Sequence, residues 1–232
     1  MTALQVLPVE GMPEVRPGDR LADLLAEHAS LVTGDVVVVT QKVVSKAEGR
    51  LAALDPDDRA ARRRLIEAES ARVLRRRGDL IISQTAHGFV CANAGVDLSN
   101  VPQGTAALLP VDPDRSARRI RDGLRGRTGV EVAVIVSDTF GRPWREGVTD
   151  VAIGCAGIAA VVDLRGTRDA SGRELTVTEV AVADELAGAA ELVMGKAAGV
   201  PAAVVRGVDA RWFGDGSVKD QIVRRPGGDL FR

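Results

Sequence analysis

Aromatic residues are scarce in this sequence of 232 residues: they make up 3% of the chain, and tyrosine is absent. Proteins that bind single-stranded nucleic acid stack bases on aromatic side chains, and this sequence offers few of them. The formal net charge is -1, so the excess of positive charge typical of nucleic-acid-binding domains is also missing. We therefore expect no nucleic-acid partner.

Cysteine and long apolar runs are equally scarce. Cys91 and Cys155 are too few for a disulfide framework or a thiolate zinc site, and both lie among small apolar residues, as buried cysteines usually do. No apolar run approaches the roughly 18 to 20 residues that cross a bilayer. The N-terminus lacks a basic segment followed by a long apolar stretch. The sequence thus predicts no membrane span, no secretory signal and a location in the cytoplasm.

The usual glycine-rich phosphate loops are missing as well. The sequence contains no G-x-x-x-x-G-K-[ST] motif and no G-x-G-x-x-G after a predicted strand. Its two histidines, His28 and His87, lie far apart in the sequence and accompany no nucleophile motif. Carboxylates and hydroxyls are the remaining metal ligands, and these oxygens suit a hard cation such as Mg²⁺ or Mn²⁺.

Apolar runs rich in valine and isoleucine alternate with helical patterns along the chain. The predicted strands are LQVLPV, DVVVVT, LIIS, VEVAVIV, IAAVVDL and AAVVRG. The predicted helices span residues 20–30, 56–77, 114–125 and 180–198. Within 56–77, acids come first and arginines last, which favours a solvated helix face over a basic binding surface. The alternation predicts an α+β (mixed α/β) fold in one domain over residues 1–232. Two interleaved subdomains, with a seam near residues 110–113, are an alternative division of the same domain.

Polar residues follow several of the predicted strands. Asp138 and Thr139 come directly after VEVAVIV, and Asp97 lies in a glycine-containing loop after another apolar run. Loops at the carboxyl ends of strands reach a common crevice, and a carboxylate beside a hydroxyl suits Mg²⁺. A Ser-Asp-Thr sequence is also common in turns, so the residues alone leave both interpretations open.

Basic residues follow two of the predicted strands, DVVVVT and VEVAVIV. Lys42 and Lys46 come after DVVVVT, four residues apart, and could meet phosphate oxygens as point charges. Ordinary surface charge is the alternative. Arg142 and Arg145, on either side of Trp144, could clamp an anionic substrate because the arginine fork matches carboxylate and phosphate oxygens.

Four stretches together resemble the coenzyme F420-0:L-glutamate ligase family, the γ-glutamyl ligases that complete the deazaflavin coenzyme F420: VEGMPEV, VVVVTQKVVSKAEGR, AGVDLSN and SDTFGRPWREGVTDVAIG. The resemblance covers nearly the whole chain. It implies an F420 γ-glutamyl ligase-like fold, a homodimer, and GTP-dependent addition of L-glutamate to F420-0 and then to a growing γ-linked tail. In some actinobacterial relatives a nitroreductase-like domain follows the ligase domain, and the resemblance leaves open whether one follows this chain.

The resemblance also implies roles for individual residues. The implied nucleotide contacts are Met12, Pro13, Glu14, Val15, Gln41, Lys46 and Asn100. The implied metal ligands are Asp97, Asp138 and Thr139, for two divalent ions, Mg²⁺ or Mn²⁺, beside a monovalent cation such as K⁺. The segment 205–212 aligns loosely with a further nucleotide-contacting segment of the family. Familiar members carry leucine at the position of Met12 and serine at that of Gln41.

Amide formation from a carboxylate needs activation, because a carboxylate is a poor electrophile at neutral pH. The resemblance implies that GTP is used, and we expect its γ-phosphate to activate the carboxylate as an acyl phosphate. The residues expected to act in this reaction are Asp138, Lys46 and Arg142, with Arg145 and Asp150 holding the glutamate. Metal ions and positioning would supply most of the catalysis. Two other classes stay open from the residues: a metal-dependent nucleotide phosphohydrolase and a non-catalytic GTP-binding module.

Overall fold

A computed structural model describes residues 3–230 of the chain. At its centre lies a five-stranded sheet in the order β1-β12-β2-β8-β9. Its strands are β1 (Gln5–Pro8), β12 (Ala202–Arg206), β2 (Val36–Thr40), β8 (Ala133–Arg142) and β9 (Arg145–Ala156). Parallel and antiparallel pairs occur in the same sheet, and helices alternate with the strands along the chain. The predicted α+β fold is confirmed.

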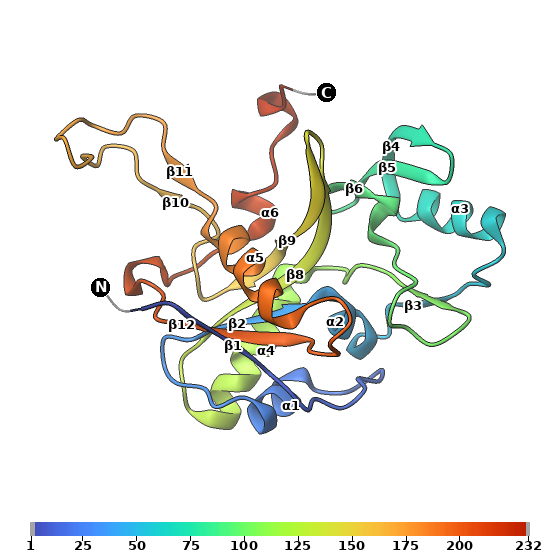
Figure 1. Cartoon of the computed structure of the whole chain (residues 1–232), viewed down its shortest axis with the longest axis horizontal. Helices are drawn as coiled ribbons and strands as arrows, with labels where there is room; N and C mark the ends of the chain where they lie inside the picture. The colour runs from blue at the N-terminus through green and yellow to red at the C-terminus, as the bar shows by residue number, and fades with distance from the viewer. Residues whose placement is uncertain (1–2, 231–232) are drawn as a thin grey trace.

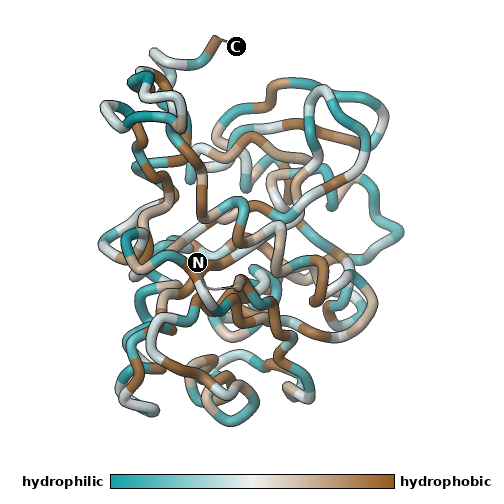
Figure 2. The backbone as a smooth tube through the Cα atoms, turned by 60° about the vertical axis from the view of Figure 1, so that its left-hand side comes forward, coloured by the Kyte–Doolittle hydropathy of each residue, from teal (hydrophilic) through white to brown (hydrophobic). Residues whose placement is uncertain are grey.

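The middle strand, β2, is buried on both faces. Its four valines at positions 36–39 are fully buried, as expected of an apolar run between two covering layers. Helices α1 (Leu21–His28) and α4 (Pro113–Thr128) pack together on one side of the sheet, and α5 (Val182–Met194) covers the other (Figure 1). Figure 2 shows hydrophobic stretches crossing the middle of the molecule. Within residues 3–230, no helix has the length and apolar composition to span a bilayer.

Strand direction determines which loops share an edge of the sheet. Strands β2 and β8 are parallel, with Thr40 opposite Ser137, so both reach their carboxyl ends at the same edge. Helix α2 (Gln41–Ala47) begins directly after β2. Strand β12 is antiparallel to β2, so its start lies at this edge and its end at the opposite edge.

A smaller part of the molecule lies between α2 and α4. Its elements are β3 (Leu51–Ala53), α3 (Arg59–Ala68), β4 (Ser70–Arg77), β5 (Leu80–Thr85), β6 (Val90–Ala92), η1 (Asn93–Gly95) and β7 (Thr105–Ala107). These elements share a core of their own, formed by Leu54, Ile66, Ile81, Ala94, Val96, Ala106 and Leu108. Residues 110–113, where the sequence suggests a seam, come directly after this core. The chain first enters the smaller part near residue 50, where the sequence gives no signal.

The helix predicted over 56–77 is only half correct. Helix α3 ends at Ala68, and β4 follows after one residue, pairing antiparallel with β5. Arginine favours helices, but the apolar β5 offers a ladder of backbone hydrogen bonds to Ser70–Arg77. Tertiary pairing therefore overrides the local helical preference.

The strand predicted to end near Ser137 continues to Arg142 and returns as β9, which the sequence analysis did not predict. The outer half of this hairpin is exposed on both faces, so it carries no alternating apolar pattern. The predicted strand IAAVVDL is also mostly wrong. Only Val162–Asp163 (β10) is a strand, paired with β11 (Glu179–Val180) at the base of an arm that projects from the body (Figure 1).

One buried carboxylate ties the C-terminal segment to the sheet. Asp114, in the first turn of α4, accepts hydrogen bonds from the amides of Cys155 in β9 and Val218 in α6 (Val218–Gln221), and from the hydroxyl of Ser217. Short 3-10 turns, η2 (Ala210–Trp212) and η3 (Pro226–Gly228), lie on either side of α6. A charge buried with this many donors is well satisfied.

Both cysteines are buried, as their small apolar neighbours indicated: Cys155 in β9 and Cys91 in β6. Burial raises the pKa of each thiol to about 12. At neutral pH both thiols are therefore protonated and poorly nucleophilic.

We predict that Gly154→Ala destabilises the protein by about 1 to 3 kcal/mol, because overpacking a closed contact forces the backbone to shift. A Cβ atom on Gly154 in β9 would lie 2.3 Å from the carbonyl carbon of Pro113 at the start of α4. Chemical denaturation would measure the loss. The matched control is Gly126→Ala, in an exposed part of α4 with no atom within 4 Å of the added Cβ, which we expect to be neutral or stabilising. Equal stability of the two variants would contradict the prediction.

Candidate functional site

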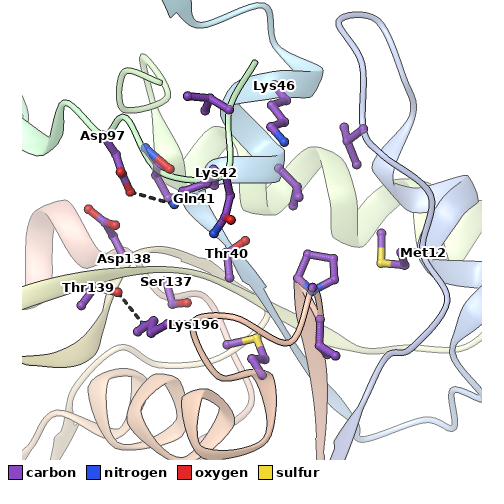
Figure 3. Close-up of a pocket in the computed structure, with 18 of the residues that line it drawn as sticks. Met12, Thr40, Gln41, Lys42, Lys46, Asp97, Ser137, Asp138, Thr139 and Lys196 are labelled. Atoms are coloured by element: carbon purple, nitrogen blue, oxygen red, sulfur yellow. Dashed lines mark hydrogen bonds and ion pairs between the residues drawn. The ribbon is translucent and has the colours of Figure 1, made fainter. Parts of the chain in front are cut away.

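A cavity of about 590 Å³ opens at the sheet edge where β2 and β8 end (Figure 3). This volume is typical of a small-molecule site. The cavity brings together eleven of the residues to which the sequence analysis assigned roles: Met12, Pro13, Glu14, Val15, Gln41, Lys46, Asp97, Asn100, Asp138, Thr139 and Asp150. They come from five separate segments of the chain. The parallel pairing of β2 and β8 accounts for their meeting.

Three of the predicted features do not line this cavity. Arg142 and Arg145 lie at the exposed turn between β8 and β9, where the Arg142 guanidinium donates to the carbonyl oxygen of Glu146 at 2.5 Å. Segment 205–212 is also absent from the lining. It begins with the last two residues of β12, which is antiparallel to β2, so it leaves the sheet at the opposite edge.

Asp97 approaches the cavity from the smaller part of the molecule. Its carboxylate forms an ion pair with Lys42 at 2.8 Å and accepts a hydrogen bond from the amide of Ser99 at 2.7 Å. Burial acts to raise the pKa of Asp97, but the bonds from Lys42 and Ser99 outweigh it and lower that pKa below its usual value. Asp97 is therefore ionised at neutral pH.

Asp138 faces Asp97 across the cavity (Figure 3). Its pKa is raised to about 7, chiefly by burial and further by the negative charges of Asp97 and Asp150. Within residues 3–230, no lysine or arginine forms an ion pair with Asp138. A cation beside this carboxylate would stabilise its charged form, so the environment of Asp138 fits that of a cation ligand.

A second group of oxygens lies around Asp150. Alternation along β8 places Ser137 and Thr139 on one face of the strand and Asp138 on the other. Both hydroxyls donate to the buried carboxylate of Asp150, Ser137 at 3.1 Å and Thr139 at 2.7 Å. The Nζ atom of Lys196 lies 2.6 Å from Asp150 Oδ1.

The lining segment that carries Lys196 was not predicted from the sequence. Glu191 and Met194 of α5, Lys196 and Pro201 all face the cavity from the connection between α5 and β12. The available signal was a single lysine between glycine and alanine, just before a predicted strand. The lysine can be assigned to the cavity only when β12 is known to run antiparallel to β2, because this direction places the start of β12 at the edge where β2 ends.

The wall expected to hold the nucleotide contains Glu14, Gln41 and Lys46. Lys46 is 5% exposed and forms an ion pair with Glu14. Gln41 is 2% exposed, and its side-chain nitrogen has no hydrogen-bond partner in the described part of the chain. A buried amide donor without a partner is costly, so this wall is suited to a ligand that brings an acceptor oxygen.

The oxygen ligands fit a hard divalent ion only as part of a larger complex. Among residues 3–230, no three His, Cys, Asp or Glu side chains form a ready-made metal cluster. Asp97 and Asp138 supply two facing carboxylates, as Mg²⁺ or Mn²⁺ prefers. The remaining ligands would have to come from water and from the oxygens of a bound anion, a common arrangement for Mg²⁺ with phosphate groups.

Comparison with known proteins identifies the kind of enzyme that carries this site. A sequence model described as F420-0:Gamma-glutamyl ligase matches residues 11–207. The chain is 48% identical to the coenzyme F420:L-glutamate ligase of Methanopyrus kandleri over 255 aligned positions, which cover 100% of both chains. It is 46% identical to the protein of that name from Methanothermobacter thermautotrophicus, covering 99% of each chain. The relative from Haloarcula marismortui is 45% identical, with 99% of this chain and 96% of the relative covered.

These matches over the full length define the protein as a ligase that forms an amide bond. More narrowly, the chain belongs to the F420-0:γ-glutamyl ligase family. The resemblance stated from its motifs is thereby confirmed.

We predict that, without metal, Asp138→Asn stabilises the protein at pH 8 by about 1 to 3 kcal/mol. The pKa of Asp138 in the folded state lies above its unfolded value, so the protonated form stabilises the fold at low pH and this stability is lost as pH rises toward 7. The gain should shrink as pH falls from 8 to 4. Denaturation in EDTA at several pH values would measure it. Asp215→Asn, at an exposed site, is the control; a gain independent of pH would contradict the prediction.

Proposed function

We propose that this chain joins L-glutamate to coenzyme F420-0, and then to the growing γ-glutamyl tail, using GTP and a divalent metal ion. The observation that carries the proposal is the meeting of facing carboxylates and lysines in one cavity, in a chain of this family. Relatives that match the whole chain are named coenzyme F420:L-glutamate ligase, which supports the same substrates.

In this proposal GTP lies along the wall formed by residues 12–15 and the start of α2. The unpartnered amide nitrogen of Gln41 donates to an acceptor oxygen of the nucleotide. Lys46 leaves the exposed carboxylate of Glu14 and holds phosphate oxygens instead. Asn100, which lines the cavity at φ 52°, completes the wall from the smaller part of the molecule.

Asp97 and Asp138 would hold the divalent ion, Mg²⁺ or Mn²⁺, and Thr139 was predicted as a further ligand. A divalent ion in this position supplies neutralisation of the triphosphate charge. The chain's own residues fix the geometry: Ser99 orients Asp97 through its amide, and the β8 backbone holds Asp138 opposite. A monovalent cation such as K⁺ beside this site stays a prediction.

The reaction proceeds in two steps. A carboxylate oxygen of F420-0 attacks the γ-phosphorus of GTP, the bond to the β-γ bridging oxygen breaks, and GDP leaves. The α-amine of glutamate then attacks the acyl carbon, loses a proton and displaces phosphate, giving the amide. The lysines that line the cavity stabilise the charge on the transferred group in the first step, and no covalent enzyme nucleophile is required.

The proposed contacts to glutamate are Asp150 in the cavity and Arg142 and Arg145 at its rim. Asp150 lines the cavity, but its carboxylate is already bonded to Ser137, Thr139 and Lys196. Arg142 and Arg145 stand outside the cavity at the turn of the β8–β9 hairpin, where they could bind an acidic group only at its outer rim. In this proposal the arginines hold the γ-glutamyl tail rather than the reacting centre.

We also propose that the chain acts as a homodimer. The arm around β10 and β11 projects from the body (Figure 1), and Val177 on it is 83% exposed. A projecting segment with exposed apolar side chains is a surface suited to a second copy.

We expect glutamylated F420-0 only when GTP, Mn²⁺, F420-0 and glutamate are all present, and no product from Asp138→Ala. Losing this carboxylate removes half of the facing pair that fixes the ion. Mass spectrometry would detect product heavier by glutamyl units, while each component is omitted in turn. Phosphate release from GTP without F420-0 or glutamate would identify a phosphohydrolase. Binding of GTP without any turnover would identify a non-catalytic module.

We expect Lys46→Ala to weaken GTP binding about 10- to 100-fold, because a charge-assisted hydrogen bond contributes about 1.5 to 3 kcal/mol. Calorimetry in the presence of Mg²⁺ would measure the affinity, and thermal unfolding would check the fold. Lys219→Ala is the matched control, since Lys219 is exposed on α6, away from the cavity. If the two variants bound GTP with equal affinity, Lys46 would not contact the nucleotide and its role would be structural.

A further inference from the structure

Lysine is distributed unevenly in this protein. The sequence contains only four lysines among its 31 basic residues, and three of them, Lys42, Lys46 and Lys196, line the cavity. Within residues 3–230, no arginine lines it. An ammonium group is a compact point charge with three donors, whereas a guanidinium is a planar fork. The positive side chains of the cavity are therefore lysines, whose compact ammonium group can be surrounded by oxygens as a metal ion is.

Lys196 has the surroundings of a coordinated cation. Its Nζ atom lies 2.6 Å from Asp150 Oδ1, 2.6 Å from Thr139 Oγ1 and 3.2 Å from Glu191 Oε1. These three oxygens come from β9, β8 and α5, so the ammonium group joins three elements at one point. The Asp150 side chain is 2% exposed, and a carboxylate this buried requires a positive partner.

The two faces of β8 carry two separate groups of oxygens. On one face, Asp138 points toward Asp97, and neither lysine nor arginine forms an ion pair with Asp138 in the described part of the chain (Figure 3). On the other face, Thr139 donates a hydrogen bond to Asp150, and the ammonium of Lys196 contacts both oxygens. Figure 3 marks the contact between Lys196 and Thr139. In the first group Lys42 pairs with Asp97 and leaves Asp138 without a positive partner among residues 3–230. In the second group the ammonium of Lys196 contacts Thr139, Asp150 and Glu191 together.

We propose that the ammonium group of Lys196 is a built-in cation in place of a second divalent ion, so that the cavity binds one divalent ion, between Asp97 and Asp138. This inference rests on the proposed metal-dependent function, and it differs from the two divalent ions implied by the family resemblance. Lys196 supplies one positive charge to the carboxylates of Asp150 and Glu191, whatever the concentration of free metal. Only the Asp97–Asp138 position then responds to Mg²⁺ or Mn²⁺.

The test is the number of Mn²⁺ ions bound per chain in the presence of GDP, measured by calorimetry and by electron paramagnetic resonance. We expect one ion in the wild-type protein, with the six-line spectrum of an isolated Mn²⁺. Lys196→Gln replaces the ammonium by a neutral amide with a carbonyl oxygen, and it should bind two ions. The second ion would be held by Thr139 and Asp150 on the other face of β8, so calorimetry should show a doubled stoichiometry.

Two further variants separate charge from shape. Lys196→Arg keeps the positive charge and should still bind one ion. Lys219→Gln makes the same chemical change at an exposed position on α6 and should also bind one ion. Thermal unfolding without metal checks that each variant folds.

The stoichiometry of the wild-type protein is decisive even without the variants. Two Mn²⁺ ions per wild-type chain would overturn the role of Lys196 and leave the proposed function intact. One ion in both wild type and Lys196→Gln would show that Lys196 does not exclude the second ion. No bound Mn²⁺ in the wild type would instead overturn the metal dependence in the proposed function, and this inference with it.

Discussion

The parallel pairing of β2 with β8 is the constraint on which the site depends. It places Thr40, the last residue of β2, opposite Ser137, so the start of α2 lies beside the part of β8 that continues past the end of β2. After β2 the chain turns into α2, and beyond Ser137 it continues as the β8–β9 hairpin. A shift of one residue in this register would turn Asp138 to the opposite face of the sheet. The buried valines of β2 fix the register, because a slip would cost their packing on both sides.

The cavity contains three pairs of opposite charge, each made by two different elements. Glu14 pairs with Lys46, Asp97 with Lys42, and Asp150 with Lys196. Partly buried pairs of this kind gain little net stability, because the attraction is offset by the loss of hydration. Their value lies in keeping both charges ordered until an anion or a cation exchanges with one partner. The exposed carboxylate of Glu14 is the easiest partner to displace, and that of Asp150 the hardest.

The elements that bury apolar side chains can be predicted from the sequence, whereas the polar, exposed strands cannot. The β2 and β12 strands and helices α1, α4 and α5 follow from valine-rich runs and helical periodicity within a few residues. The outer half of the β8–β9 hairpin and β4 are missed, because polar strands exposed on both faces are specified by backbone pairing and not by an apolar pattern. Burial patterns report only the strands that bury side chains.

Some residues of the candidate site can likewise be selected from the sequence, and others cannot. Asp97, Asp138 and the residues after β2 stand next to recognisable strands and motifs, so they can be selected from the sequence. Lys196 cannot, because its place in the cavity depends on the antiparallel direction of β12 and on the position of α5 above the sheet. The same direction carries segment 205–212 to the opposite edge. Topology, which a single sequence does not specify, decides which of two connecting loops faces the ligand.

The two buried cysteines are natural probes of local unfolding in two parts of the molecule. Cys155 belongs to the five-stranded sheet and Cys91 to the three-stranded one, and neither thiol ionises while its sheet is closed. A thiol reagent therefore modifies each cysteine only when the surrounding sheet opens. The two labelling rates report separately on the part of the protein that carries β8 and on the part that carries the Asp97 loop, without any engineered probe.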